Sequence, residues 1–167
     1  MPLALRTKRS TSTGLASLVV GVLAAVGCAE TDETWQVPMV EYALFKDDVY
    51  PVLLRDCGFH GCHGSGDRYF RVWGPGRVRL AVKGQRDESS AFDPVTDLEI
   101  NSSYQSAIGF VDARDARRSL LLRKPLATEA GGAGHLGVDK YGRNVYRTPD
   151  SPGYLELSKW VFSVMPP

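Results

Sequence analysis

Two cysteines and an adjacent histidine in a glycine-rich segment restrict what this 167-residue chain can fold into more than any other feature does. The segment reads DCGFHGCHGSG over residues 56–66, with four residues between Cys57 and Cys62 and with His63 directly after Cys62. Two sulfurs and an imidazole this close in sequence either hold a shared metal or cofactor, or the sulfurs pair with each other. Each outcome ties the chain to itself near residue 60, so the remaining elements must pack around this segment.

Composition and charge narrow the functional classes. The chain is 43% hydrophobic and 23% charged, which is typical of a globular domain. Its formal net charge of +1 lacks the basic excess of a nucleic-acid-binding protein. No Ser/His/Asp arrangement, phosphate-binding glycine loop or paired acid–base signature stands out, so we expect neither an enzyme nor a small-molecule substrate.

Residues 1–27 have the pattern of a signal peptide. Basic residues come first, and the uncharged stretch LASLVVGVLAAV follows over 15–26, too short to span a bilayer comfortably. The stretch ends in Ala-Val-Gly-Cys, which resembles a bacterial lipobox with Cys28 as the lipidated first mature residue. The alternative is ordinary signal-peptidase cleavage nearby, with Cys28 incidental.

Lipidation at Cys28 would anchor the chain to a bacterial membrane. Ala29 follows the cysteine where an Asp would indicate inner-membrane retention, so we expect the outer membrane, facing the periplasm or the cell surface. Export places Cys57 and Cys62 in an oxidising compartment, where unligated thiols tend to pair. It is also the compartment in which bacteria attach c-type haem.

The mature chain divides into a polar tether, 28–38, and a domain, 39–167. Apolar residues at three- and four-residue steps predict a helix over 40–49, which Pro51 either kinks or follows with a new turn. Further helices are expected at 104–111, at 117–123 and after the cap Ser151-Pro152. Alternation on both sides of Gly74-Pro75-Gly76 predicts a β-hairpin over 69–82. The predicted class is mainly α, with loop-rich segments and a short β-hairpin insertion.

Covalent haem attachment requires two sulfurs that add across the vinyl groups and an imidazole that binds iron from one face. The Cys62-His63 pair meets the demand that the histidine directly follow the second cysteine. The gap of four residues exceeds the usual two. Gly58 and Gly61, at the two ends of the gap, would allow the extra residues to loop out.

Two alternatives use the same residues. A zinc ion would take Cys57, Cys62 and His63 with either His60 or His135, although adjacent residues are awkward ligands for one tetrahedral ion. A Cys57–Cys62 disulfide would close a short loop and leave no cofactor site.

The stretch FKDDVYPVLLRDCGFHGCHG, residues 45–64, resembles the start of small class I-like bacterial cytochrome c domains of the planctomycete type. Two later stretches fit the same family: DARRSLLLRKP over 115–125 and YLELSKWV over 154–161. The resemblance covers about 45–165. It implies a cytochrome c-like helical fold, with haem c bound covalently through Cys57 and Cys62 and with His63 as the proximal iron ligand.

A haem would need a sixth iron ligand. His135 is our first choice, because the glycine-rich loop Gly131-Gly132-Ala133-Gly134 before it can bring an imidazole close to a porphyrin face. Met165 is the second choice, since Met165-Pro166-Pro167 resembles a signature of the family.

With both axial positions filled, electron transfer is favoured over catalysis. The expected function is that of a membrane-anchored monohaem electron-transfer lipoprotein acting on a redox partner protein that the sequence does not identify. The alternative is a non-catalytic structural or binding lipoprotein without haem, holding a Cys57–Cys62 disulfide or a zinc ion.

Overall fold

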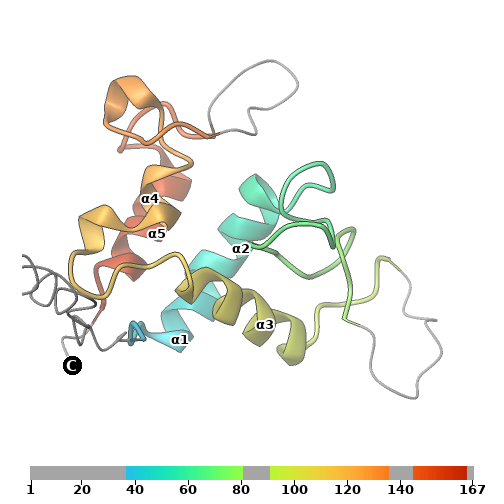
Figure 1. The fold of residues 1–167 in the computed structure, drawn as a ribbon. Helices are drawn as coiled ribbons and strands as arrows, with labels where there is room; N and C mark the ends of the chain where they lie inside the picture. The colour runs from blue at the N-terminus through green and yellow to red at the C-terminus, as the bar shows by residue number, and fades with distance from the viewer. Residues whose placement is uncertain (1–36, 81–90, 136–144, 165–167) are drawn as a thin grey trace, which may run out of the picture. The chain divides into compact units, whose positions relative to one another are not determined.

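The computed structural model describes residues 37–80, 91–135 and 145–164, and Figure 1 shows their arrangement. These residues form helical segments and no strand, and an isolated bridge joins Leu126 and Tyr146. The mainly α class predicted from the sequence is therefore confirmed. In chain order the helices are α1 (Tyr42–Leu44), η1 (Phe45–Val49), α2 (Tyr50–Val52), η2 (Leu53–Cys57), α3 (Asp97–Ile108), η3 (Ala116–Arg118), α4 (Leu120–Arg123), η4 (Thr128–Ala130) and α5 (Pro152–Val161).

The first four segments join into one helical stretch from Tyr42 to Cys57. Two of its turns, η1 and η2, are π-helical. Pro51 lies near the start of α2, directly after η1, where its missing N–H and its ring disturb regular α pairing. The helix predicted over 40–49 is confirmed, and it continues past Pro51 to the first cysteine of the motif.

The helix α3 begins earlier than predicted. The expected helix covered 104–111, whereas α3 runs from Asp97 to Ile108. Its start is fixed by a capping box: Thr96 Oγ1 accepts from the Glu99 amide, and Glu99 accepts from the Thr96 amide. The first turns carry few apolar residues, so the hydrophobic pattern alone missed them.

The helices predicted at 117–123 and after Ser151 are confirmed as η3 with α4 and as α5. Leu121 and Leu122 are buried as expected, but Leu120 is 42% exposed. Ser151 makes no side-chain cap, so Pro152 in the first turn, rather than a cap, favours the start of α5.

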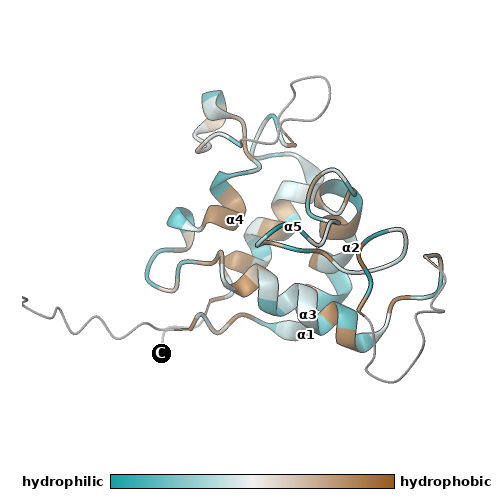
Figure 2. Ribbon diagram, turned by 45° about the vertical axis from the view of Figure 1, so that its right-hand side comes forward, coloured by the Kyte–Doolittle hydropathy of each residue, from teal (hydrophilic) through white to brown (hydrophobic). Residues whose placement is uncertain are grey.

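The core forms where α5 packs against the first helical stretch. Phe45, Leu53, Leu157 and Trp160 are fully buried, and the Phe45 and Trp160 rings lie 5.0 Å apart. The Trp160 indole also donates to the Glu41 carbonyl at 2.9 Å, so its polar atom stays satisfied. Figure 2 shows apolar and polar residues interleaved along α3 and α5, as expected for helices with one buried face.

The β-hairpin prediction is wrong for residues 69–80, which contain no strand; Val82 lies outside the described residues. The chain does turn at Gly74, where the Arg77 amide donates to the Gly74 carbonyl at 3.0 Å. The inward alternation holds only before the turn, where Phe70 and Val72 are buried; after it, Val78 and Leu80 are half-buried.

In place of strand pairing, the backbone of this segment donates hydrogen bonds to side chains of α3. The Arg71 and Trp73 amides donate to the hydroxyls of Ser106 and Ser103 on α3, at 2.9 and 3.1 Å. Because α3 supplies these acceptors, the segment needs no second strand to satisfy its backbone.

Among the described residues, no helix combines the length and apolar character needed to cross a bilayer. The predicted signal peptide 1–27, the predicted lipidation site Cys28 and nearly all of the predicted tether 28–38 lie outside the described ranges.

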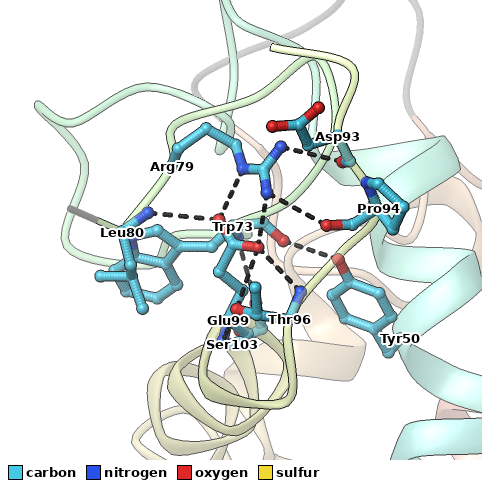
Figure 3. Close-up of polar contacts among 9 residues, drawn as sticks. All are labelled: Tyr50, Trp73, Arg79, Leu80, Asp93, Pro94, Thr96, Glu99 and Ser103. Atoms are coloured by element: carbon cyan, nitrogen blue, oxygen red, sulfur yellow. Dashed lines mark hydrogen bonds and ion pairs between the residues drawn. The ribbon is translucent and has the colours of Figure 1, made fainter. Parts of the chain in front are cut away.

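A buried ion pair joins α3 to the segment after the turn (Figure 3). Glu99 is 1% exposed, and the Arg79 guanidinium donates to its carboxylate at 2.6 and 3.1 Å. The amides of Leu80 and Thr96 donate to the same carboxylate at 3.2 and 3.0 Å. Arg79 also donates to the carbonyls of Asp93 and Pro94. The pair therefore holds residue 80 and residues 93–96 together on the first turn of α3.

We predict that Glu99→Gln destabilises the fold by about 3 kcal/mol at pH 7, because it removes the buried carboxylate that accepts two hydrogen bonds from the Arg79 guanidinium. Burial alone would raise the pKa of Glu99, but the Arg79 pair and the two backbone donors outweigh it and hold the pKa below 4.5. The stabilisation is therefore present above about pH 4.5 and is lost as the pH falls below that value. Urea unfolding at pH 7 and pH 4 measures the difference, which should shrink at the lower pH.

Asp97→Asn is the matched control, since Asp97 pairs with Lys46 on the surface at 2.8 Å. Equal destabilisation by Asp97→Asn and Glu99→Gln would contradict the role assigned to the buried pair.

Candidate functional site

The cysteine–histidine motif forms a compact loop at the end of the first helical stretch. The π turn η2 ends at Cys57, and the Gly58 amide donates back to the Leu53 carbonyl at 2.8 Å. The chain then reverses, because the amides of Cys62 and Gly64 both donate to the Phe59 carbonyl, at 2.8 and 3.0 Å. The His63 amide donates to the Cys57 carbonyl at 3.1 Å and closes the loop. The four-residue gap is thus absorbed in a hydrogen-bonded turn that returns His63 to the backbone of Cys57.

Two glycines allow this close return. A Cβ on Gly64 would collide with the carbonyl oxygen of Gly58, and a Cβ on Gly58 would lie 2.9 Å from the Leu54 carbonyl. A Cβ on Gly61 would meet nothing within 4 Å. The expectation that Gly58 and Gly61 together permit the loop is therefore half right, because the second glycine that is needed is Gly64.

We predict that Gly64→Ala lowers the free energy of unfolding by about 2 kcal/mol or more, since the backbone of Gly58 cannot move aside as a flexible side chain would. Gly61→Ala should be neutral within about 0.5 kcal/mol. Thermal unfolding of the two variants beside the parent protein provides the measurement. Similar effects at both positions would contradict the packing described for this loop.

The two thiols are free and differ in environment. Cys57 is buried and Cys62 is half-buried. Burial raises the pKa of the Cys57 thiol to about 12, so the sulfur is held neutral at physiological pH.

The His63 ring is oriented by one backbone carbonyl. Its Nδ1 lies 3.0 Å from the Phe70 carbonyl oxygen. Because a carbonyl only accepts, Nδ1 carries the proton and Nε2 keeps its lone pair. Burial lowers the pKa of His63, which keeps the ring neutral. A neutral imidazole whose other nitrogen is fixed by a carbonyl is the usual form of a metal-ligating histidine.

The structure brings the His135 ring next to the His63 ring. The two ring centres lie 5.8 Å apart with an interplanar angle of 86°. This separation is that of an ordinary edge contact between two rings, and it makes the two imidazoles direct neighbours.

The glycine-rich loop positions His135 as its composition suggested. Gly131 and Gly134 adopt positive φ angles of 91° and 72°, which favour glycine. A Cβ on Gly132 would collide with the Leu126 carbonyl. The Ala133 amide donates to the Arg123 carbonyl at 2.8 Å, so the loop is fastened to the end of α4.

An aromatic wall lies beside the imidazoles. Phe70 packs on His63 with ring centres 4.7 Å apart, and Phe110 packs on Phe70 at 5.4 Å. Phe59, another aromatic of the motif, is 53% exposed. Trp160 belongs to the main core with Phe45.

The two other predicted ligands are not placed beside these imidazoles by the described residues. His60 is exposed, and Met165 lies outside the described residues. Within the described ranges, no group of three or more His, Cys, Asp or Glu side chains is placed to hold a metal ion. The ligand set of the zinc alternative, Cys57 and Cys62 with His63 and His60 or His135, is thus not assembled.

A further contact beside the motif was not foreseen from the sequence. The buried Tyr146 hydroxyl donates to Asp56 Oδ2 at 2.9 Å, and Arg55 pairs with the same carboxylate. Burial and the neighbouring acidic groups raise the pKa of Tyr146, so it remains a donor. A Cβ on Gly153 would lie 2.5 Å from Asp56 Oδ2, so α5 approaches this pair closely. The contact fixes the residue before Cys57, but its partners are too far apart in sequence to be paired by any local pattern.

No protein-family model, no curated protein and no solved structure matches this chain.

Proposed function

We propose that this chain is a membrane-anchored, monohaem c-type cytochrome-like electron-transfer lipoprotein. Cys57 and Cys62 would hold the haem through thioethers, His63 would be the proximal ligand and His135 the distal one. The observation that carries the proposal is the pairing of His63 and His135, 5.8 Å apart, directly beside two unpaired cysteines.

Each residue has a defined task in this proposal. The Phe70 carbonyl holds His63 Nδ1 and presents Nε2 as the ligand atom. The loop that the Ala133 amide fastens to α4 would present His135 as the second ligand. Phe70 and Phe110 keep one edge of the site apolar, which limits access of water.

A haem bound here would supply a one-electron couple with no open coordination position, so the proposed role is electron transfer to or from a partner protein and not catalysis. A pair of imidazole ligands favours a lower reduction potential than one imidazole with a thioether. With His135 and not Met165 as the distal ligand, we expect a reduction potential at the lower end of the range for such proteins.

The alternative functions receive less support. A Cys57–Cys62 disulfide would require pairing that the structure does not contain, and the zinc alternative has no assembled ligand set among the described residues. The disulfide alternative gives no reason for the placement of His135 against His63.

We predict that protein exported in a host that attaches c-type haem is red, with a low-spin spectrum. His63→Ala should lose the colour. His135→Ala should keep the haem but convert the low-spin spectrum to high-spin, since one axial ligand is lost. Visible spectroscopy and the pyridine-haemochrome assay measure both effects.

His60→Ala is the matched control, because His60 is an exposed histidine of the same motif; its spectrum should equal that of the parent. An unchanged spectrum in His135→Ala would transfer the distal role to Met165. Colourless parent protein would reject the haem proposal altogether.

Membrane anchoring at Cys28 is part of the same proposal, and it rests on the lipobox-like sequence before that residue. Labelling of growing cells with a tagged fatty acid tests it directly. We expect label on the mature protein and none on the Cys28→Ala variant; an unlabelled parent protein in the soluble periplasmic fraction would reject the anchor.

A further inference from the structure

Arg77 makes an unusual set of contacts with the cysteine–histidine loop. Its Nη2 donates to the Leu54 carbonyl at 3.1 Å, and its Nη1 donates to the Gly76 carbonyl at 2.9 Å. The guanidinium carbon also lies 5.3 Å from the centre of the Phe59 ring, in cation–π contact. Arg77 thus joins the end of the first helical stretch to the residues of the extended Cys–Cys gap.

The same side chain lies against both ends of the loop. A Cβ placed on Gly58 would be 3.1 Å from Arg77 Nε, and one placed on Gly64 would be 2.8 Å from Arg77 Cδ. Gly58 follows Cys57, and Gly64 follows His63. The Arg77 side chain therefore lies against the residue that follows Cys57 and against the residue that follows His63.

Among the residues that the structure describes, no acidic side chain forms an ion pair with Arg77. Its hydrogen bonds go to carbonyl oxygens, and its Nε is buried without a partner among the described residues. A buried donor left unpaired is unfavourable. In this structure the unpaired Nε lies beside Gly58 of the loop. We therefore ask what the Arg77 side chain contributes to the loop.

We propose that Arg77 is a positioning residue for the Cys57–His63 loop, and that its fixed positive charge raises the reduction potential of the centre. The second part rests on the haem function proposed above. Reduction adds one electron to the centre, so a nearby cation without a counter-ion stabilises the reduced form. Phe59 is one of the four residues between the cysteines, and its contact with the Arg77 guanidinium supports the longer loop at that point.

Three variants separate charge from packing. Arg77→Met removes the charge and keeps an unbranched side chain against Phe59, whereas Arg77→Lys keeps the charge and loses the planar group that reaches the Leu54 carbonyl. Arg117→Met is the control, since Arg117 makes the same kind of cation–π contact, 5.9 Å from the centre of the Phe162 ring, outside the motif.

We expect the midpoint potential, measured by spectroelectrochemical titration, to fall in Arg77→Met, to stay close to that of the parent in Arg77→Lys and to stay unchanged in Arg117→Met. Amide hydrogen exchange at Cys62, His63 and Gly64 should accelerate in both Arg77 variants, because the loop loses its support, and not in Arg117→Met.

A potential in Arg77→Met equal to that of the parent, or lowered equally in Arg117→Met, would overturn the electrostatic role. Unchanged exchange in both Arg77 variants would overturn the positioning role. A parent protein without haem would overturn the proposed function and with it the effect on the potential, while the exchange measurement on the same haem-free chain would still decide the positioning role.

Discussion

The hydrogen bond from the His63 amide to the Cys57 carbonyl, 3.1 Å long, is the contact on which the rest of the structure depends. It turns the chain back onto the helix end and closes the loop that carries both cysteines. The segment after the loop then pairs with it, because the Val72 amide donates to the His63 carbonyl and the Val78 amide to the Gly64 carbonyl, both at 2.8 Å. That pairing brings the Phe70 carbonyl to the His63 ring. The orientation of the imidazole is thus a consequence of how the loop closes.

The described residues contain no sheet, so side chains satisfy many backbone groups that strand pairing would otherwise satisfy. Ser103 and Ser106 on α3 accept from the Trp73 and Arg71 amides. The buried Glu99 accepts from the Leu80 amide as well as from Arg79. These contacts fix the segment over α3, and the Tyr146–Asp56 contact fixes the other flank of the motif.

The sequence predicted the elements whose signal is local. The apolar residues of the first helical stretch and of α5 recur with helical period, and both helices were found. The hydrophobic pattern does not predict the early start of α3, because Thr96 and Glu99 mark it by a capping box and not by apolar side chains. The hairpin was wrongly predicted because alternation reports a buried face only, and the hydroxyls of α3 took the place of a partner strand.

The same limit applies to the site, where residues adjacent in sequence can be predicted and contacts between distant residues cannot. Cys57, Cys62 and His63 are adjacent in sequence, so their proximity needed no structure. The choice of His135 rested on a glycine-rich loop, and the structure does place that ring near His63; its role as a ligand stays a prediction. The contributions of Arg77 and Tyr146 depend on partners 23 and 90 residues away, which no local pattern connects.

Mass spectrometry of the peptide that contains Cys57 and Cys62, taken from fully matured exported protein, tests the central claim most directly. If haem is attached, we expect this peptide to be heavier by the mass of one haem and neither of its two cysteine sulfurs to react with a thiol-alkylating reagent. A peptide of unmodified mass whose sulfurs are alkylated, or are joined to each other, would contradict it.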